Sequence, residues 1–250
     1  SEFVYGKTYM FFSHTIKKQP HNKKLLQAIL KNNVRMVDYE TSTYPNGFRA
    51  LGFGRFAGIA GVHNAIIGFG KRNSLFHLKS AHLCRDRNGM NNEMKKDKLP
   101  PLKIVMTGEG RVAGGAKESL DVLGIRQVLS EEFLNKNFTE PVWCQLGVTQ
   151  YNKRKDGKTG SDPDFFKNPQ DYESAFLPYA NVSDIFLSCH FWDPKAPKLF
   201  SLEYLRKPDF KIKVIADISC DINGSVPTTI RSTTIEDPFF AHFICKSLCS

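Results

Sequence analysis

The stretch "LKIVMTGEGRVAGGAKESLDVLGIRQVLSEE" (residues 102–132) decides the fold. An apolar run at its start predicts a buried strand, and the residues after the glycines have the spacing of a helix. The segment "IRQVLSEE" (125–132) predicts a second strand that ends in two acids. Since a strand, a crossover helix and a second strand form a β-α-β unit, we expect parallel strands in an α/β domain.

The turn between this strand and the helix has the spacing Gly108-x-Gly110-x-x-Ala113. In a dinucleotide site the first glycine makes a tight turn, and the second lets the backbone approach a pyrophosphate. A small third residue, a role open also to Gly114 and Gly115, lets the helix pack closely. The helix amino terminus then offers N–H groups to the phosphates. We predict a dinucleotide site, with a purely structural glycine turn as the alternative.

Two acids follow the turn at the distance expected for a residue that binds the ribose. Glu131 and Glu132 come about 20 residues after Gly110 and favour NAD as the cofactor. Arg126 lies near enough in sequence to leave NADP open. We also include Arg111, the residue after the second glycine, in the predicted cofactor site.

Further strands extend this domain, which we expect to span residues 79–231. "DIFLSC" (184–189) and "KIKVIADISCD" (211–221) have the continuous apolar pattern of buried parallel strands, and "SLEYLRK" (201–207) predicts a helix between them. Together they predict a doubly wound sheet. The polar stretch 149–179 predicts an excursion out of that sheet, because long structureless loops are uncommon in compact domains.

The chain before this domain predicts another β-α-β unit. Residues 8–13 and 34–40 have strand patterns, with an amphipathic helix over 22–33. If the strands are parallel neighbours, His14 and Glu40 lie at the same carboxyl edge. A histidine after a strand is compatible with an active site or with a strand end that carries charge for structural reasons.

We interpret residues 1–53 as part of a substrate domain and 54–78, rich in glycine and alanine, as a helix between domains. Residues 232–250 are expected to form a tail that returns toward the first domain. The opening Ser-Glu-Phe lacks a starting Met, so we expect the chain to begin partway into its natural protein.

The composition indicates which class of protein this is and which kinds of partner it is expected to bind. The 250 residues carry 35 Lys and Arg against 25 Asp and Glu, and 41% hydrophobic residues is ordinary for a globular protein. The positive charge is concentrated in the first 100 residues without a nucleic-acid-binding motif. We therefore expect an anionic small-molecule substrate, no nucleic acid and no membrane, because no apolar run approaches about 20 residues.

The six cysteines indicate no metal site, since none form a Cys-x-x-Cys pair and the histidines lack a zinc-binding spacing. Several of them lie in apolar strand-like runs, where a free cysteine acts as a small buried hydrophobe. A reducing, cytoplasmic compartment is the resulting expectation.

Four segments together resemble the saccharopine dehydrogenase (lysine-forming) and lysine–2-oxoglutarate reductase family, which is related to alanine dehydrogenase and the NAD-binding subunit of transhydrogenase. They are "FFSHTIKKQPHNKKLLQAILKNNVRMVDYE" (11–40), "ALGFGRFAGIAG" (50–61), "GEGRVAGGA" (108–116) and "VIADISCDINGSVP" (214–227). The resemblance implies two Rossmann-like domains around a cleft, the first incomplete here, with the dinucleotide on the later one.

The resemblance also implies roles for single residues. It places His14 at the family's catalytic histidine, Lys17 at a basic position beside it, and Asp217 on the nicotinamide side of the cleft. Glu40 is then available to orient the histidine or bind an amine. Arg49 and Arg55 are candidates for a substrate carboxylate. The family's catalytic lysine and its substrate-binding arginine, both upstream of the histidine, have no counterpart here.

Three functions follow, of which the first is our prediction and the other two are alternatives that stay open. The first is an NAD(P)-dependent, opine-type amino acid dehydrogenase that interconverts a saccharopine-like adduct with lysine and 2-oxoglutarate. The second is an alanine dehydrogenase-like oxidoreductase. The third is a non-catalytic dinucleotide-binding fragment. A homo-oligomeric assembly also stays open.

Overall fold

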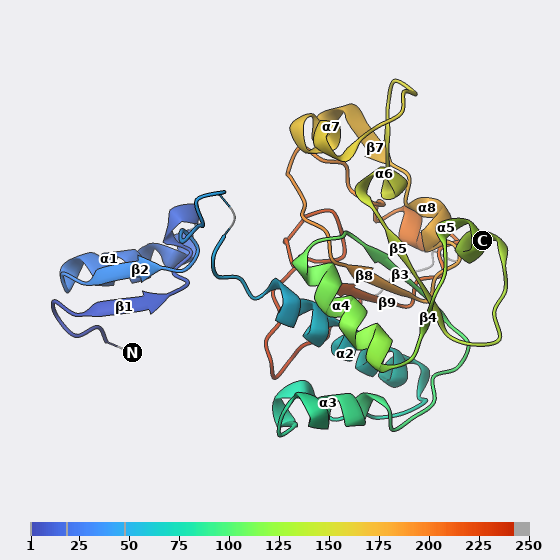
Figure 1. The fold of residues 1–250 in the computed structure, drawn as a ribbon, viewed down its shortest axis with the longest axis horizontal. Helices are drawn as coiled ribbons and strands as arrows, with labels where there is room; N and C mark the ends of the chain where they lie inside the picture. The colour runs from blue at the N-terminus through green and yellow to red at the C-terminus, as the bar shows by residue number, and fades with distance from the viewer. Residues whose placement is uncertain (1, 19, 48, 243–250) are drawn as a thin grey trace, which may run out of the picture. The chain divides into compact units, whose positions relative to one another are not determined.

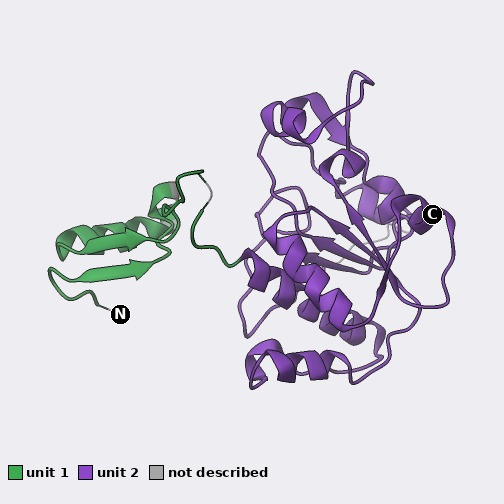
Figure 2. Ribbon diagram, in the orientation of Figure 1, with its two compact units in different colours: residues 1–53 green, residues 54–250 purple. Residues whose placement is uncertain are grey.

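The computed structural model describes residues 2–18, 20–47 and 49–242, without the side chains of Lys17 and His21 (Figure 1). The chain divides into two compact units, residues 1–53 and 54–250 (Figure 2). Among the described residues, no helix is both long enough and apolar enough to span a bilayer.

The first unit is the predicted β-α-β arrangement. Strand β1 (Thr8–Phe11) runs parallel to β2 (Arg35–Asp38), and helix α1 (Lys23–Lys31) connects them. Two short 3-10 turns, η1 (Thr15–Lys17) and η2 (Pro20–Asn22), precede the helix. Parallel pairing brings the carboxyl ends of both strands to one edge, which confirms the expected shared edge for the residues that follow them.

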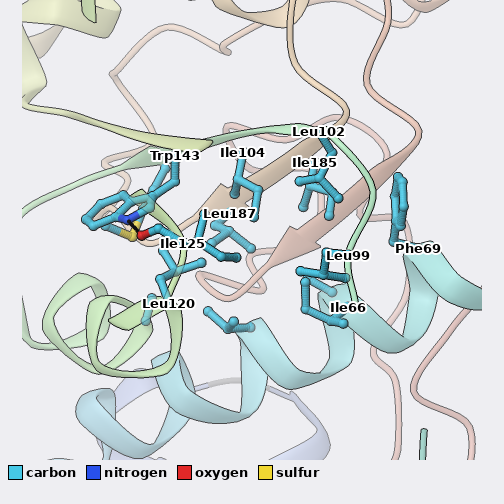
Figure 3. Packing of buried hydrophobic residues seen from close by; sticks show 14 of the residues in the cluster. Ile66, Phe69, Leu99, Leu102, Ile104, Leu120, Ile125, Trp143, Ile185 and Leu187 are labelled. Carbon is cyan, nitrogen blue, oxygen red and sulfur yellow. Dashed lines mark hydrogen bonds between the residues drawn. The ribbon is translucent and has the colours of Figure 1, made fainter. Parts of the chain in front are cut away.

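The second unit contains a five-stranded parallel sheet with the order β4-β5-β3-β8-β9. The strands are β3 (Lys103–Thr107), β4 (Arg126–Gln127), β5 (Val142–Leu146), β8 (Ile185–Ser188) and β9 (Val214–Asp217). Successive residues of the central strands point to opposite faces. Ile104, Met106 and Trp143 enter one core with helices α2 (Gly54–Asn73) and α4 (Arg111–Val122) (Figure 3).

The other face of the sheet carries a second core, which includes Val105, Cys144 and Phe186. It packs against α5 (Ser130–Asn135), α6 (Val148–Tyr151), α7 (Asp162–Lys167) and α8 (Leu177–Ala180). Since both faces are covered, the strands must be apolar on both sides, and the sheet is the doubly wound α/β arrangement expected.

One predicted strand is wrong. Residues 125–132 form only the two-residue β4, and Ser130 begins helix α5 with Glu131 and Glu132 in its first turn. Acids at that position favour a helix start because they face the positive end of the helix dipole. The apolar strand β5 is inserted between β4 and β3, where burial on both faces suits its sequence VWCQL.

Glycines bring α2 and α4 into backbone contact. A Cβ on Gly58 would overlap the Val112 carbonyl oxygen, and one on Gly115 would overlap the Arg55 carbonyl oxygen. The expected close packing of the small-residue segment is therefore present, but Gly115 serves helix–helix contact rather than contact with a strand. Helix α2 ends at Asn73, five residues earlier than predicted.

The predicted excursion from the sheet is present over residues 148–180. Strands β6 (Asn152–Arg154) and β7 (Tyr172–Ser174) form a separate antiparallel pair beside α7. Arg154 pairs with Asp156 and Asp164, and the Tyr172 hydroxyl donates a 2.6 Å hydrogen bond to Asp164. Remaining elements are η3 (Ala81–Leu83), α3 (Arg87–Met94), η4 (Pro169–Asp171) and η5 (Tyr204–Arg206), the last a single turn where a helix was predicted.

Candidate functional site

The glycine turn closes β3 and opens α4, as the motif predicts. Gly108 has φ 97°, and a Cβ there would lie 2.8 Å from the Cys189 carbonyl oxygen and 2.9 Å from the His190 Cα. Both its conformation and its packing therefore require glycine. Its amide donates a 2.9 Å hydrogen bond to the Leu146 carbonyl of β5. The turn is held between the ends of β5 and β8.

Gly110 is different, because a Cβ on it would meet no atom within 4 Å. It is the N-cap residue of α4, in extended conformation, and nothing within the described protein requires a glycine there. The open space lies at the amino terminus of a twelve-residue helix. Such a terminus favours anions, so the arrangement suits a phosphate group. Ala113 is fully buried and Arg111 is exposed on the first turn.

The strand order locates this turn within the sheet. β3 has β5 on one side and β8 on the other, so its carboxyl end is where the chain changes direction across the sheet. In open α/β sheets, ligands bind outside the carboxyl ends of strands at this switch point. The glycine turn therefore occupies the expected ligand position of the fold.

The structure does not support the predicted ribose acids at this turn. Glu131 and Glu132 follow the edge strand β4, and β5 lies between β4 and β3. Glu132 is 3.6 Å from Arg126 and 3.5 Å from Lys136. Their predicted role in ribose binding relied on a longer strand that pairs directly with β3, whereas β4 has two residues and pairs with β5.

A nearer acid is Glu109, between the two glycines. Its Oε2 would lie 2.9 Å from a Cβ added to Gly147, the residue that follows β5. The carboxylate therefore lies between the glycine turn and the end of the neighbouring strand. The sequence holds no signal for this placement, because it depends on which strand pairs with β3.

Beyond β3, polar side chains join the carboxyl ends of β8 and β9. Asp217 ends β9, and its two oxygens accept 2.5 Å hydrogen bonds from the Ser219 and Thr229 hydroxyls. The predicted nicotinamide-side acid thus lies at the expected edge of the sheet, where it fixes the loop that follows its own strand.

The buried His190, one residue after Cys189, has Nδ1 2.7 Å from Thr107 Oγ1 and Nε2 2.9 Å from Ser225 Oγ. Burial lowers the pKa of His190 to about 4, although the charge of Asp217 acts in the opposite direction. Burial, together with that same charge, raises the pKa of the Cys189 thiol to about 12. A thiol that is protonated at neutral pH does not act as a nucleophile.

In the first unit, His14 and Glu40 meet at the shared strand edge. His14 Nδ1 lies 3.0 Å from Glu40 Oε2, and Arg49 lies 3.6 Å from the other Glu40 oxygen. Glu40 is buried, whereas the His14 side chain is about half exposed at 49%. His14 adopts the left-handed conformation with φ 54°, which is uncommon for a non-glycine residue. Lys17 has its backbone in η1, but its side chain lies outside the described residues.

Sequence reasoning missed Asp38, which organises this edge. Burial on its own would raise the Asp38 pKa, but the Ser13 hydroxyl and the backbone amides of Glu40 and Ser13 donate hydrogen bonds that lower it. The carboxylate thereby fixes Ser13, the residue before His14, and the backbone of Glu40. The sequence held no signal for this role, because Asp38 lies inside the strand predicted over 34–40, whereas β2 ends at Asp38.

Arg55, a predicted substrate ligand, belongs to the second unit. Its Nε and Nη2 donate 2.6 and 2.8 Å hydrogen bonds to the two carboxylate oxygens of Glu118 on α4. This bidentate pair joins α2 to α4 beside the glycine contact described above. The structure therefore gives its guanidinium an intramolecular partner.

Comparison with known proteins places the chain among related enzymes, although no family model matches it. It is 30% identical over 275 residues to alpha-aminoadipic semialdehyde synthase from Arabidopsis thaliana, covering 94% of this chain. It is 22% identical over 221 residues to the NAD(+), L-lysine-forming saccharopine dehydrogenase from Candida glabrata, covering 84% of this chain. The chain is a homologue of these enzymes.

This homologue spans 26% of the length of the Arabidopsis thaliana relative and 50% of the Candida glabrata one. Among solved structures, an L-alanine dehydrogenase chain has a TM-score of 0.47 and 13% identity, covering 96% of this chain and 57% of its own. The sequence relationship confirms the family resemblance identified from the four quoted segments.

Proposed function

We propose that the second unit binds a nicotinamide dinucleotide at the glycine turn, with the pyrophosphate at Gly110 and the amino terminus of α4. The observation that carries this is the contrast between the two glycines. Packing requires Gly108, whereas the space around a Cβ on Gly110 is open. A glycine N-cap with no neighbouring side-chain atoms lets a phosphate group approach the helix backbone closely.

For the cofactor, we favour NAD over NADP. The name of the Candida glabrata relative specifies NAD(+) for that protein. In this chain, the Glu109 carboxylate lies against the end of β5, next to the glycine turn. An acid near the ribose accepts hydrogen bonds from its hydroxyls and repels a 2′-phosphate.

The activity we propose is that of an opine-type amino acid dehydrogenase, which interconverts a saccharopine-like adduct with lysine and 2-oxoglutarate. The relatives' names support the substrate class, and the cofactor, when bound, supplies or accepts the hydride. Because the chain spans a part of those relatives, the activity is a proposal for the whole protein. The free thiols of Cys84, Cys144 and Cys189 support the proposal of a cytoplasmic location.

His14 is the residue we propose as proton shuttle for that reaction. With Nδ1–H donated to Glu40, the neutral ring presents Nε2 as a proton acceptor. Glu40 would hold this tautomer and stabilise the imidazolium after proton uptake. Arg49, near the same carboxylate, supplies positive charge for a substrate carboxyl group.

Titration of the 250-residue chain with NADH tests cofactor binding, with energy transfer from Trp143 and Trp192 as the signal. Gly110→Leu should weaken binding at least about tenfold, because its side chain fills the open space. Gly89→Leu, the same change at a helical position with only ordinary contacts, is the matched control and should bind as the parent does. Identical affinity for both variants would contradict the proposed site.

Oxidation of NADH with different substrate pairs tests the reaction. With the whole protein, we expect turnover with 2-oxoglutarate plus lysine. Turnover confined to pyruvate plus ammonia would instead assign an alanine dehydrogenase activity. Tight NADH binding without turnover on either pair would assign a dinucleotide-binding role without catalysis.

A further inference from the structure

His190 joins three segments that are far apart in the sequence. Its ring contacts Thr107, the last residue of β3, and Ser225, in the loop beyond β9, while its own backbone follows β8. Its partners are 83 residues before it and 35 residues after it. One side chain thus links the carboxyl ends of two central strands to a third segment of the edge.

The two hydrogen bonds use both ring nitrogens and leave none for a substrate. A neutral imidazole donates from one nitrogen and accepts at the other, and a hydroxyl group can complete either role. All three side chains are buried, so each hydrogen bond satisfies a polar group that water cannot reach. The arrangement suits a fixed neutral ring rather than a proton-transfer group.

The same residue borders the glycine turn. A Cβ on Gly108 would lie 2.9 Å from the His190 Cα, and the Cys189 amide donates a 3.1 Å hydrogen bond to the Thr107 carbonyl. A shift of the His190 backbone or ring would therefore move Thr107 or compress Gly108. The glycine turn has little freedom that is independent of His190.

We propose that His190 is a positioning residue for the nucleotide site, which holds the glycine turn in its binding conformation through Thr107 and Ser225. The effect on NADH binding rests on the proposed cofactor function. The effect of His190 on the conformation of the glycine turn does not depend on a ligand. His190→Leu removes both hydrogen bonds and places an apolar side chain at the position. It should loosen the turn and weaken NADH binding.

The chain offers a matched control in His63. This histidine of α2 is also fully buried, with Nε2 2.8 Å from the Lys79 carbonyl oxygen, but it belongs to the core that contains helix α2 rather than to the carboxyl edge. His63→Leu should lower stability without affecting the turn. Ser225→Ala is a milder variant that removes one hydrogen bond and serves if His190→Leu fails to fold.

Two measurements decide the proposal, each on the folded fraction of the protein. The NADH dissociation constant should rise about tenfold in His190→Leu, the change expected for roughly one net hydrogen bond, and stay within about twofold in His63→Leu. Amide hydrogen exchange over residues 107–112 should accelerate in His190→Leu and in Ser225→Ala, with no acceleration in His63→Leu.

Equal exchange in the His190 and His63 variants would overturn the positioning role, whatever happens to stability. If the parent protein does not bind NADH, the proposed function fails, and the exchange measurement still decides whether His190 fixes the turn. If exchange accelerates while NADH affinity stays at the parent value, the link between the turn and the nucleotide is overturned.

Discussion

Gly115 of α4 packs against Arg55 of α2 so closely that a Cβ on the glycine would overlap the Arg55 carbonyl oxygen. Its neighbour Gly114 has open space around it on the same helix. A side chain at position 115 would clash with α2, whereas one at position 114 would not. The same substitution can therefore be compared at the two positions.

We expect Gly115→Ala to lower the free energy of unfolding by about 2 kcal/mol or more, because α2 and α4 must separate to admit the methyl group. Gly114→Ala should raise it by about 0.5–1 kcal/mol, since alanine restricts the unfolded chain and favours a helix. Urea denaturation followed by circular dichroism measures both. A loss of similar size in the two variants would contradict the described helix contact.

His14→Ala should remove most turnover while leaving NADH affinity unchanged. A general acid–base group contributes about 10²–10⁴-fold, so kcat should fall within that range. Turnover is measured in the whole protein, per folded, NADH-competent molecule. His77→Ala, at an exposed histidine of the second unit, is the control and should retain parental turnover. Unchanged kcat in His14→Ala would leave His14 as a structural strand-end residue.

Glu109→Gln should reduce the preference for NADH over NADPH about tenfold, because the repulsion of a 2′-phosphate is removed. Glu131→Gln should leave the preference unchanged, since β5 separates the β4–α5 region from the glycine turn. The ratio of the two dissociation constants is the measurement. A change in Glu131→Gln with none in Glu109→Gln would restore the ribose role first assigned to the later acids.

Stability should fall as pH decreases from about 6.5 toward about 4 because of His190. Burial holds its folded pKa at about 4, below its usual value of 6.5, so the unfolded chain takes up a proton that the folded protein resists. The charged or titratable groups near it are Asp217, Cys189 and Tyr151. This contribution amounts to about 2 kcal/mol lost between pH 7 and pH 5.

Urea denaturation at both pH values measures that loss, and His190→Gln is the comparison. The variant should be less stable than the parent at pH 7, but its stability should fall less between pH 7 and pH 5. His63, whose pKa burial also lowers, acts in the same direction in both proteins and therefore cancels in the difference. Parallel pH profiles for parent and variant would show that His190 does not titrate as described.

Local sequence patterns correctly predicted the features that depend on residues close together in the chain. The glycine spacing at Gly108 and Gly110, the parallel pair in the first unit and the shared edge of His14 and Glu40 all follow from short-range periodicity and connection rules. Each depends on neighbours within a single β-α-β unit.

The missed features depend on pairing between distant segments. Insertion of β5 between β3 and β4 changes which loop borders the glycine turn, and no local period encodes strand order. The contacts of His190 likewise join Thr107 and Ser225 across the sheet edge. A pattern read along the chain places this histidine at the end of a predicted strand but does not give its partners.

The shortness of β4 also bears on whether another chain could pair with the sheet at this edge. An edge strand exposes unpaired backbone groups that can recruit a strand from another chain. Here the edge is two residues long, and the Arg126 side chain on it is bonded to Glu140 at 2.8 Å. A two-residue strand with an arginine on it offers little template for edge-to-edge pairing, so we expect this side of the sheet not to recruit a strand from another chain.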